Sequence, residues 1–119
     1  MFTIAKTFTF EAAHSLVMLP ADHKCHRPHG HSYNVTLILE SATLDRYGFV
    51  VDYGAGLDGF GKWVEETLDH QDLNEIVLCA TTVENLSKWI YEVWMNRIPQ
   101  LVAVRLSETP KTWAEYRPV

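Results

Sequence analysis

The chain has 119 residues, of which 47% are hydrophobic and 21% charged, and its formal net charge is −5. These values are typical of one globular domain, residues 1–119, with a hydrophobic core of its own. The acidic balance and scattered basic residues argue against a nucleic-acid-binding surface. No apolar run is long enough to cross a membrane, and the two cysteines are too few for a disulfide framework, so we expect a cytoplasmic protein.

Residues 2–14 alternate between apolar and polar side chains, which predicts a half-buried β-strand. Phe8, Phe10 and Ala12 share one parity, and His14 continues the same face at the end of the strand. A lone histidine on an apolar face is more often a hydrogen-bonded core residue than a metal ligand. The interpretation of His14 therefore depends on which residues the fold brings beside it.

A second alternating stretch, residues 31–40, follows a long loop, residues 15–28. Loops of this length inside a small domain are uncommon and often functional. His29 and His31 are two residues apart, so on an extended strand both imidazoles point to the same side. If the two strands pair antiparallel, His14 comes close to this pair. Three imidazoles around one open position form a catalytic type of zinc site.

Two helices are predicted in the second half of the chain. Residues 55–68 carry an apolar stripe at helical spacing, although two glycines weaken the pattern. Residues 82–97 carry a stronger stripe, and Thr81-x-x-Glu84 at its start is typical of a capping box.

Two further strands are predicted at residues 101–108 and 112–117. Glu108 ends the buried face of the first, where a carboxylate needs a partner. The order ββααββ predicts an α+β domain, a four-stranded antiparallel sheet with two helices on one face. Such a sheet has two open edges, and pairing between subunits would cover them, so we expect an oligomer.

Five short motifs occur in order across nearly the whole chain. They are Phe10-Glu-Ala-Ala-His14, Cys25-x-x-x-His29-Gly-His31-Ser-Tyr33, Leu68-Asp-His70, Thr82-x-Glu84-Asn85 and Ser107-Glu108-Thr109. Together they resemble the 6-pyruvoyltetrahydropterin synthase family, and within it the bacterial 6-carboxytetrahydropterin synthases of queuosine biosynthesis. Each motif alone is weak, whereas five in register are specific.

The resemblance implies a tunnelling fold (T-fold), in which subunits form a trimeric barrel and two trimers commonly stack into a hexamer. It also implies that His14, His29 and His31 bind Zn²⁺, and that the small-molecule substrate is 7,8-dihydroneopterin triphosphate. Neutral imidazoles suit zinc, and an open fourth position can take and polarise a substrate hydroxyl or carbonyl.

The resemblance further implies catalytic roles for Cys25, Asp69 and His70, with the cysteine and the Asp–His pair supplied by different subunits. A thiol near a metal or an imidazolium can act as a general acid or base. An aspartate can orient a histidine and stabilise its charged form. The alternatives are an inert, small hydrophobic role for Cys25 and a turn cap for Asp69.

Glu108 matches the family's glutamate that anchors the pterin ring, since a carboxylate can accept two hydrogen bonds from a planar donor pair. The alternative is an ion pair with Arg105 or Lys111. Thr82 and Glu84 match the family's pterin-pocket segment, and the alternative for them is a helix cap.

Two reactions occur on this scaffold. One branch eliminates triphosphate and leaves a 6-pyruvoyl side chain; the other also breaks a carbon–carbon bond, releasing acetaldehyde and triphosphate to leave a 6-carboxylate. The four-residue step from Cys25 to His29 and the ending 108–118 resemble the carboxy branch, a zinc-dependent carbon–carbon lyase. The alternatives are the pyruvoyl synthase, an aldolase-type cleavage that Cys25 argues against, and a non-catalytic zinc- and pterin-binding protein.

Overall fold

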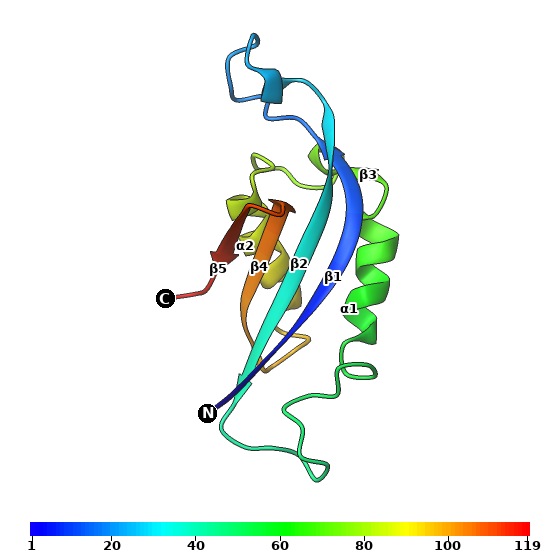
Figure 1. Ribbon diagram of the computed structural model, residues 1–119, viewed down its shortest axis with the longest axis vertical. Helices are drawn as coiled ribbons and strands as arrows, with labels where there is room; N and C mark the ends of the chain where they lie inside the picture. The colour runs from blue at the N-terminus through cyan, green and yellow to red at the C-terminus, as the bar shows by residue number, and fades with distance from the viewer.

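The computed structural model describes residues 1–119 and consists of one β-sheet with two helices on one face (Figure 1). The strands are β1 (Phe2–His14), β2 (His29–Ser41), β3 (Gln71–Asp72), β4 (Leu101–Thr109) and β5 (Thr112–Tyr116). Across the sheet they lie in the order β3-β1-β2-β4-β5. The molecule is elongated, 56 × 29 × 26 Å, because the loop at the tip of the β1–β2 hairpin and the loop after β2 project from opposite ends.

The predicted pairing of the first two strands is confirmed. β1 and β2 run antiparallel without interruption, from Phe2 opposite Ser41 to His14 opposite His29. Their alternation places every second side chain under the helices, and the central Leu37 on that face is fully buried. Because the register is continuous, the apolar pattern and the position of the histidines are fixed together.

The first helix is shorter than the predicted 55–68. It consists of α1 (Asp58–Trp63) followed by a π-helical turn, Val64–Leu68. Its predicted apolar stripe is confirmed, since all four members are at most 2% exposed: Leu57, Phe60, Val64 and Leu68. Gly61 lets the helix approach β1 closely, because a Cβ there would lie 3.3 Å from the ring of Phe8.

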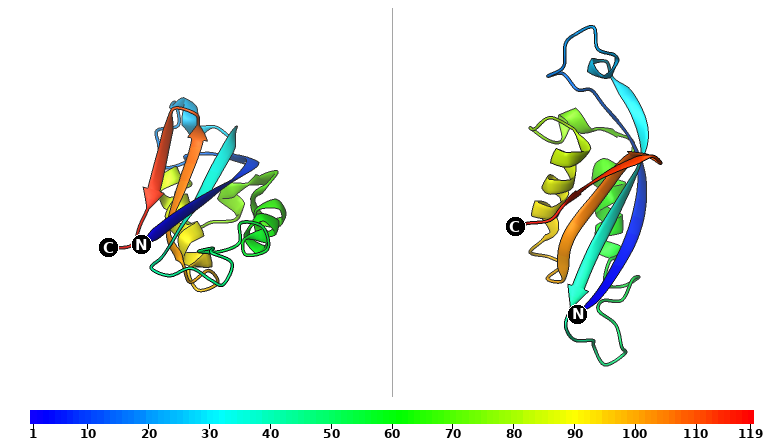
Figure 2. Two further views of the ribbon diagram at one scale, coloured as in Figure 1. Left: turned by 60° about the horizontal axis from the view of Figure 1, so that its bottom comes forward. Right: turned by 60° about the vertical axis from the view of Figure 1, so that its left-hand side comes forward.

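The second helix, α2 (Val83–Trp94), is also shorter than the predicted 82–97. Leu86 and Ile90 on its inner face are buried against the sheet, and the helix contacts β4 and β5. Both helices lie on the same side of the sheet, as Figure 2 shows. Neither has the length and apolar composition that a membrane crossing requires.

The expected four-stranded antiparallel sheet is wrong in one respect. A fifth strand, β3, lies beside β1 at the sheet edge and pairs in parallel, Ala12 with Gln71 and Ala13 with Asp72, so the sheet is mixed. Two residues cannot show a period of two, and the sequence around them is polar. This short strand nevertheless brings the segment after the first helix next to the end of β1.

The second face of the sheet carries no helix and is largely polar. Thr7 and Thr36 share a hydrogen bond of 2.8 Å across β1 and β2, and Arg105 pairs with Glu115 at 3.1 Å across β4 and β5. Such cross-strand pairs stabilise an exposed face. Polar side chains of this face therefore find partners on neighbouring strands, while the backbone of the outer edge strands stays open to pairing.

We expect Leu37→Ala to lower the free energy of unfolding by about 2–5 kcal/mol, since a fully buried leucine leaves a cavity when truncated. Leu78, whose side chain is fully exposed, provides the matched control, and Leu78→Ala should change the value by less than about 0.5 kcal/mol. Urea unfolding at one fixed protein concentration measures both. Equal effects of the two substitutions would contradict the assigned core.

Candidate metal centre and active site

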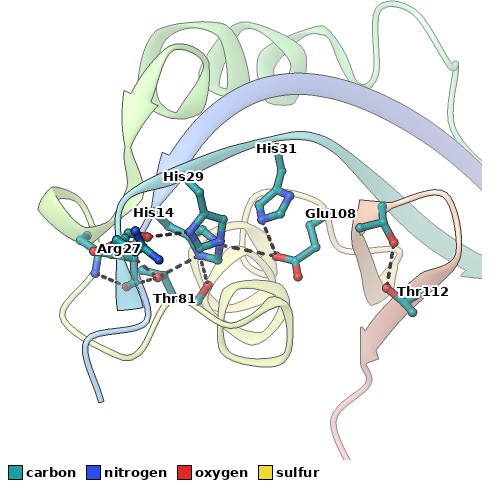
Figure 3. A network of polar contacts seen from close by, with 10 residues as sticks. His14, Arg27, His29, His31, Thr81, Glu108 and Thr112 are labelled. Carbon is teal, nitrogen blue, oxygen red and sulfur yellow. Dashed lines mark hydrogen bonds and ion pairs between the residues drawn. The ribbon is translucent and has the colours of Figure 1, made fainter. Parts of the chain in front are cut away.

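Three histidines from the ends of β1 and β2 form one cluster (Figure 3). His14 lies opposite His29 in the antiparallel register, and His31 lies opposite Ala12, so all three side chains share the helix-covered face. One potential ligand atom from each lies within 4.8 Å of the other two. The predicted meeting of His14, His29 and His31 is confirmed.

The hydrogen bonds of these imidazoles leave their other ring nitrogens free. Nδ1 of His14 donates to the carbonyl of Thr81 at 2.8 Å, and Nδ1 of His29 donates to the carbonyl of Arg27 at 2.7 Å. The Nε2 atoms of His14 and His31 are buried and have no hydrogen-bond partner. Burial lowers the pKa of His14, which favours the neutral imidazole that metals bind. The cluster can therefore hold a metal ion.

Glu108, near the end of β4, completes the polar surroundings of the cluster. Its Oε2 lies 3.5 Å from Nε2 of His31 and 3.6 Å from Nε2 of His14. Arg105 pairs with Glu115 instead, and no ion pair joins Glu108 to Lys111, so the ion-pair alternative for Glu108 is wrong. A carboxylate thus stands directly beside the free imidazole nitrogens and is still partly exposed.

Asp69 and His70 form a hydrogen-bonded pair at the edge of the sheet. The π-helical turn ends with the Asp69 N–H bonded to the carbonyl of Val64, which directs the chain back to β1. There Asp69 Oδ1 accepts from the Glu11 backbone N–H at 2.8 Å, and Oδ2 accepts from His70 Nδ1 at 2.9 Å. These two bonds, the backbone one first, lower the pKa of Asp69.

His70 has a constrained backbone and an accessible ring. Its φ of 59° lies in the left-handed region, which is uncommon for a residue with a side chain. Its N–H donates to the carbonyl of Glu11, which holds that conformation. With Nδ1 bonded to Asp69 and the side chain 79% exposed, Nε2 faces solvent. The pair can accept or deliver a proton at that atom.

An open hollow of about 540 Å³ lies between this pair and the hairpin. His70 and Asp72 line one side, and His31 and Ser32 line the other. The hydroxyl of Ser32 donates to Glu11 Oε2 at 2.7 Å, on the face of the sheet opposite the three imidazoles. The hollow is therefore a polar space large enough for part of a small ligand, at the same end of the sheet as the histidine cluster.

Cys25 stands apart from the Asp–His pair within one chain. It lies in a short 3₁₀ turn, Lys24–His26, in the long loop, and its side chain is partly buried. Its N–H donates to Nδ1 of His23 at 3.0 Å, and its carbonyl accepts from Leu16 at 2.8 Å. No hydrogen bond joins the thiol to His70. The backbone of the cysteine is thus fixed while its thiol remains available.

The expected Thr81-x-x-Glu84 capping box is wrong by one residue. Thr82 is the N-cap of α2, and its hydroxyl accepts from the Asn85 N–H at 3.2 Å. Thr81 cannot cap the helix because it is buried against His14. Glu84 lies in the first helical turn, where its charge is favourable. The structure therefore gives Thr82 a capping role.

Sequence reasoning missed three residues near the cluster. Thr81 and Asn74 contact the His14 segment, and the hydroxyl of Tyr33 is buried without a partner. Burial and the nearby charge of Glu108 raise the pKa of Tyr33, so its proton stays in place as a possible donor. Only Tyr33 had a signal in the sequence, its position on the face of His31.

Comparison with known proteins identifies the family. Residues 3–119 match the family described as 6-pyruvoyl tetrahydropterin synthase, and the chain belongs to it. It is 33% identical to 6-carboxy-5,6,7,8-tetrahydropterin synthase of Synechocystis, covering 98% of this chain and 93% of that one, and 29% identical to the Bacillus subtilis protein of the same name, covering 98% and 86%. The structure of Caenorhabditis elegans 6-pyruvoyl tetrahydropterin synthase superposes with a TM-score of 0.86 at 27% identity, covering 99% and 96%.

We expect His29→Ala to abolish stoichiometric metal binding, because it removes one of the three imidazoles. His26→Ala is the matched control, since His26 bonds to the Leu19 carbonyl in the same loop and lies outside the cluster. Titration of the metal-free protein with Zn²⁺, followed by metal analysis after gel filtration, measures the difference. Retention of zinc by His29→Ala would contradict the assigned ligand set.

Proposed function

We propose that this chain is a 6-carboxy-5,6,7,8-tetrahydropterin synthase, which converts 7,8-dihydroneopterin triphosphate and one molecule of water to 6-carboxytetrahydropterin, acetaldehyde and triphosphate on the route to queuosine. The single observation that carries the proposal is the cluster of free imidazole nitrogens beside Glu108 in a chain of this family. The names of the Synechocystis and Bacillus subtilis relatives support the carboxy product. The reaction also fits a reducing compartment such as the cytoplasm, because it needs a free thiol.

We propose Zn²⁺ as the metal, held by His14, His29 and His31. Three neutral imidazoles with one open position suit zinc better than the oxygen-seeking Mg²⁺ or Ca²⁺. When bound, zinc supplies Lewis acidity toward a substrate oxygen. Two of the histidines are already oriented for metal binding, because backbone carbonyls accept hydrogen bonds from their Nδ1 atoms and leave Nε2 free.

Glu108 is proposed to anchor the pterin ring. A carboxylate can accept hydrogen bonds from the 2-amino group and the neighbouring ring N–H together, which fixes the plane of the ring. Its position supports this role, because Oε2 lies 3.5 Å from Nε2 of His31 and 3.6 Å from Nε2 of His14, and no cation of the chain competes for the carboxylate. Thr82 and Glu84 at the start of α2 would border the same pocket.

Cys25 and the Asp69–His70 pair are proposed to move the protons. The Cys25 thiol would act on the substrate side chain near the metal, and His70, oriented by Asp69, would exchange protons with it. Within one chain these groups are not hydrogen-bonded to each other, which supports a site completed by a neighbouring subunit. We therefore propose a homo-oligomer, a trimer or hexamer, built through the open sheet edges.

The second candidate is the 6-pyruvoyl synthase. The name of the structurally similar C. elegans protein favours it, because that fold matches at 27% identity over nearly the whole chain. The two reactions differ in whether a carbon–carbon bond breaks. The four-residue step from Cys25 to His29 supports the carboxy product instead, because it resembles the carboxy branch of the family.

Incubating the zinc-loaded protein with 7,8-dihydroneopterin triphosphate under reducing, anaerobic conditions tests the proposal. We expect acetaldehyde and 6-carboxytetrahydropterin by mass spectrometry. A pyruvoyl side chain with triphosphate release would establish the second candidate. A substrate that binds and stays unchanged would indicate a non-catalytic pterin-binding protein.

We expect Cys25→Ala to lower turnover at least about 100-fold, the usual contribution of a proton-transfer group, while zinc content stays the same. Cys79→Ala is the matched control, because Cys79 is exposed and outside the cluster, and it should retain full activity. Initial rates and metal content of the purified variants measure both effects. Wild-type activity in Cys25→Ala would rule out the proposed role of the thiol.

Mixing two inactive variants tests the shared site. Cys25→Ala and His70→Ala, refolded together in equal amounts, should recover about a quarter of wild-type activity, since random assembly gives that share of sites both intact groups. Each variant refolded alone is the control and should remain inactive. No recovery in the mixture, with wild-type protein refolding normally, would place both groups in one subunit.

A further inference from the structure

The residue that follows His14 is held by a side chain far away in the sequence. Asn74, in the 3₁₀ turn Leu73–Glu75, accepts the Ser15 backbone N–H at Oδ1 and donates through Nδ2 to the Ser15 carbonyl, both at 2.8 Å. The amide thus bonds both backbone groups of Ser15, as a neighbouring strand would. This contact lies directly beyond the last residue of β1 and keeps the chain extended there.

Thr81 closes the arrangement on the other side of His14. Its carbonyl accepts from Nδ1 of His14 at 2.8 Å, and its hydroxyl lies 3.2 Å from the same nitrogen. The same hydroxyl lies 3.5 Å from the Ser15 carbonyl and 3.4 Å from Asn74 Oδ1, so it can donate to either. Three segments distant in sequence therefore meet at one buried point, since Thr81 is 1% exposed.

This clamp, defined as Asn74, Thr81 and Ser15, fixes the imidazole of His14. The bond to the Thr81 carbonyl requires the proton on Nδ1, which leaves the Nε2 lone pair free to face His29 and His31. The support of His29 is weaker, because the Arg27 carbonyl that accepts its hydrogen bond belongs to an exposed residue of the long loop. The rigid part of the cluster is thus His14.

We infer that Asn74 and Thr81 are positioning residues for the metal centre, which set its affinity by holding His14 in a metal-ready orientation and tautomer. Outer-shell groups of this kind typically change metal affinity 10- to 100-fold when they are lost. This inference rests on the proposed metal binding by the histidine cluster. Neither residue touches the metal itself, so both act through His14.

Zinc affinity of a small set of variants tests the inference. We expect Asn74→Ala and Asn74→Asp to weaken Zn²⁺ binding about 10-fold or more in competition with a chelator. The aspartate keeps an acceptor for the Ser15 N–H but presents a second acceptor to the Ser15 carbonyl. Thr81→Val keeps the carbonyl that accepts from His14 but removes the hydroxyl beside His14, Ser15 and Asn74, so it should also weaken binding. Thr81→Ser, which retains the hydroxyl, should bind as the wild type does.

A spectroscopic readout separates positioning from general stability. The Co²⁺-loaded Asn74 and Thr81→Val variants should show altered visible absorption, because the orientation of one ligand changes. Val77→Ala is the control, since Val77 packs in the core close to Asn74 and lies outside the clamp. It should lower the melting temperature while leaving zinc affinity and the Co²⁺ spectrum unchanged.

The outcomes are distinguishable. Wild-type affinity and spectrum in Asn74→Asp and Thr81→Val would overturn the inference alone, with the proposed metal site intact. A wild-type protein that binds no Zn²⁺ would overturn both, since the clamp would then have no metal ligand to position. An equal loss of zinc affinity in Val77→Ala would also overturn the inference, because the affinity would then depend on the stability of the fold and not on the orientation of His14.

Discussion

The antiparallel register of β1 and β2 is the constraint on which the rest of the structure depends. It places His14 opposite His29, and the period of two puts His31 on the same face as the buried Val35 and Leu37. A slip of one residue would move both the core side chains and the imidazoles of one strand to the other face of the sheet. The hydrophobic effect that selects this register therefore also assembles the histidine cluster.

The same register makes the site costly for the isolated fold. Buried polar atoms without partners destabilise a protein, and two imidazole nitrogens and the Tyr33 hydroxyl are in this condition. The structure limits the cost at His14, where burial favours the neutral ring and the Thr81 carbonyl accepts a hydrogen bond from Nδ1. A ligand that satisfies the remaining nitrogens would stabilise the folded state by mass action. Stability and binding are thus linked at one end of the sheet.

Cys25 and the Asp69–His70 pair, which are proposed to transfer protons, are arranged on a different principle from the histidine cluster. The histidines come from long paired strands, whereas Cys25 lies in a projecting loop and Asp69–His70 follows a π-helical turn. The left-handed backbone of His70 is held by a hydrogen bond to the Glu11 carbonyl on β1. The backbone of the Asp69–His70 pair is therefore fixed, although the His70 ring is exposed. An exposed, fixed dyad and a separate thiol fit a site that forms between copies of the chain.

Alternation and spacing by themselves predicted β1, β2 and both helices, because each depends on a repeated local pattern. The grouping of three histidines followed from these strands only with the further expectation that they pair antiparallel, which the structure confirms. The motifs also indicated Asp69–His70, whose pairing the structure bears out. The short strand β3 and the burial of Thr81 could not be predicted, since two residues show no period and a buried threonine looks like a helix cap. The contact of Asn74 with Ser15 is likewise decided only when distant segments pack together, because its hydrogen bonds have no local signature in the chain.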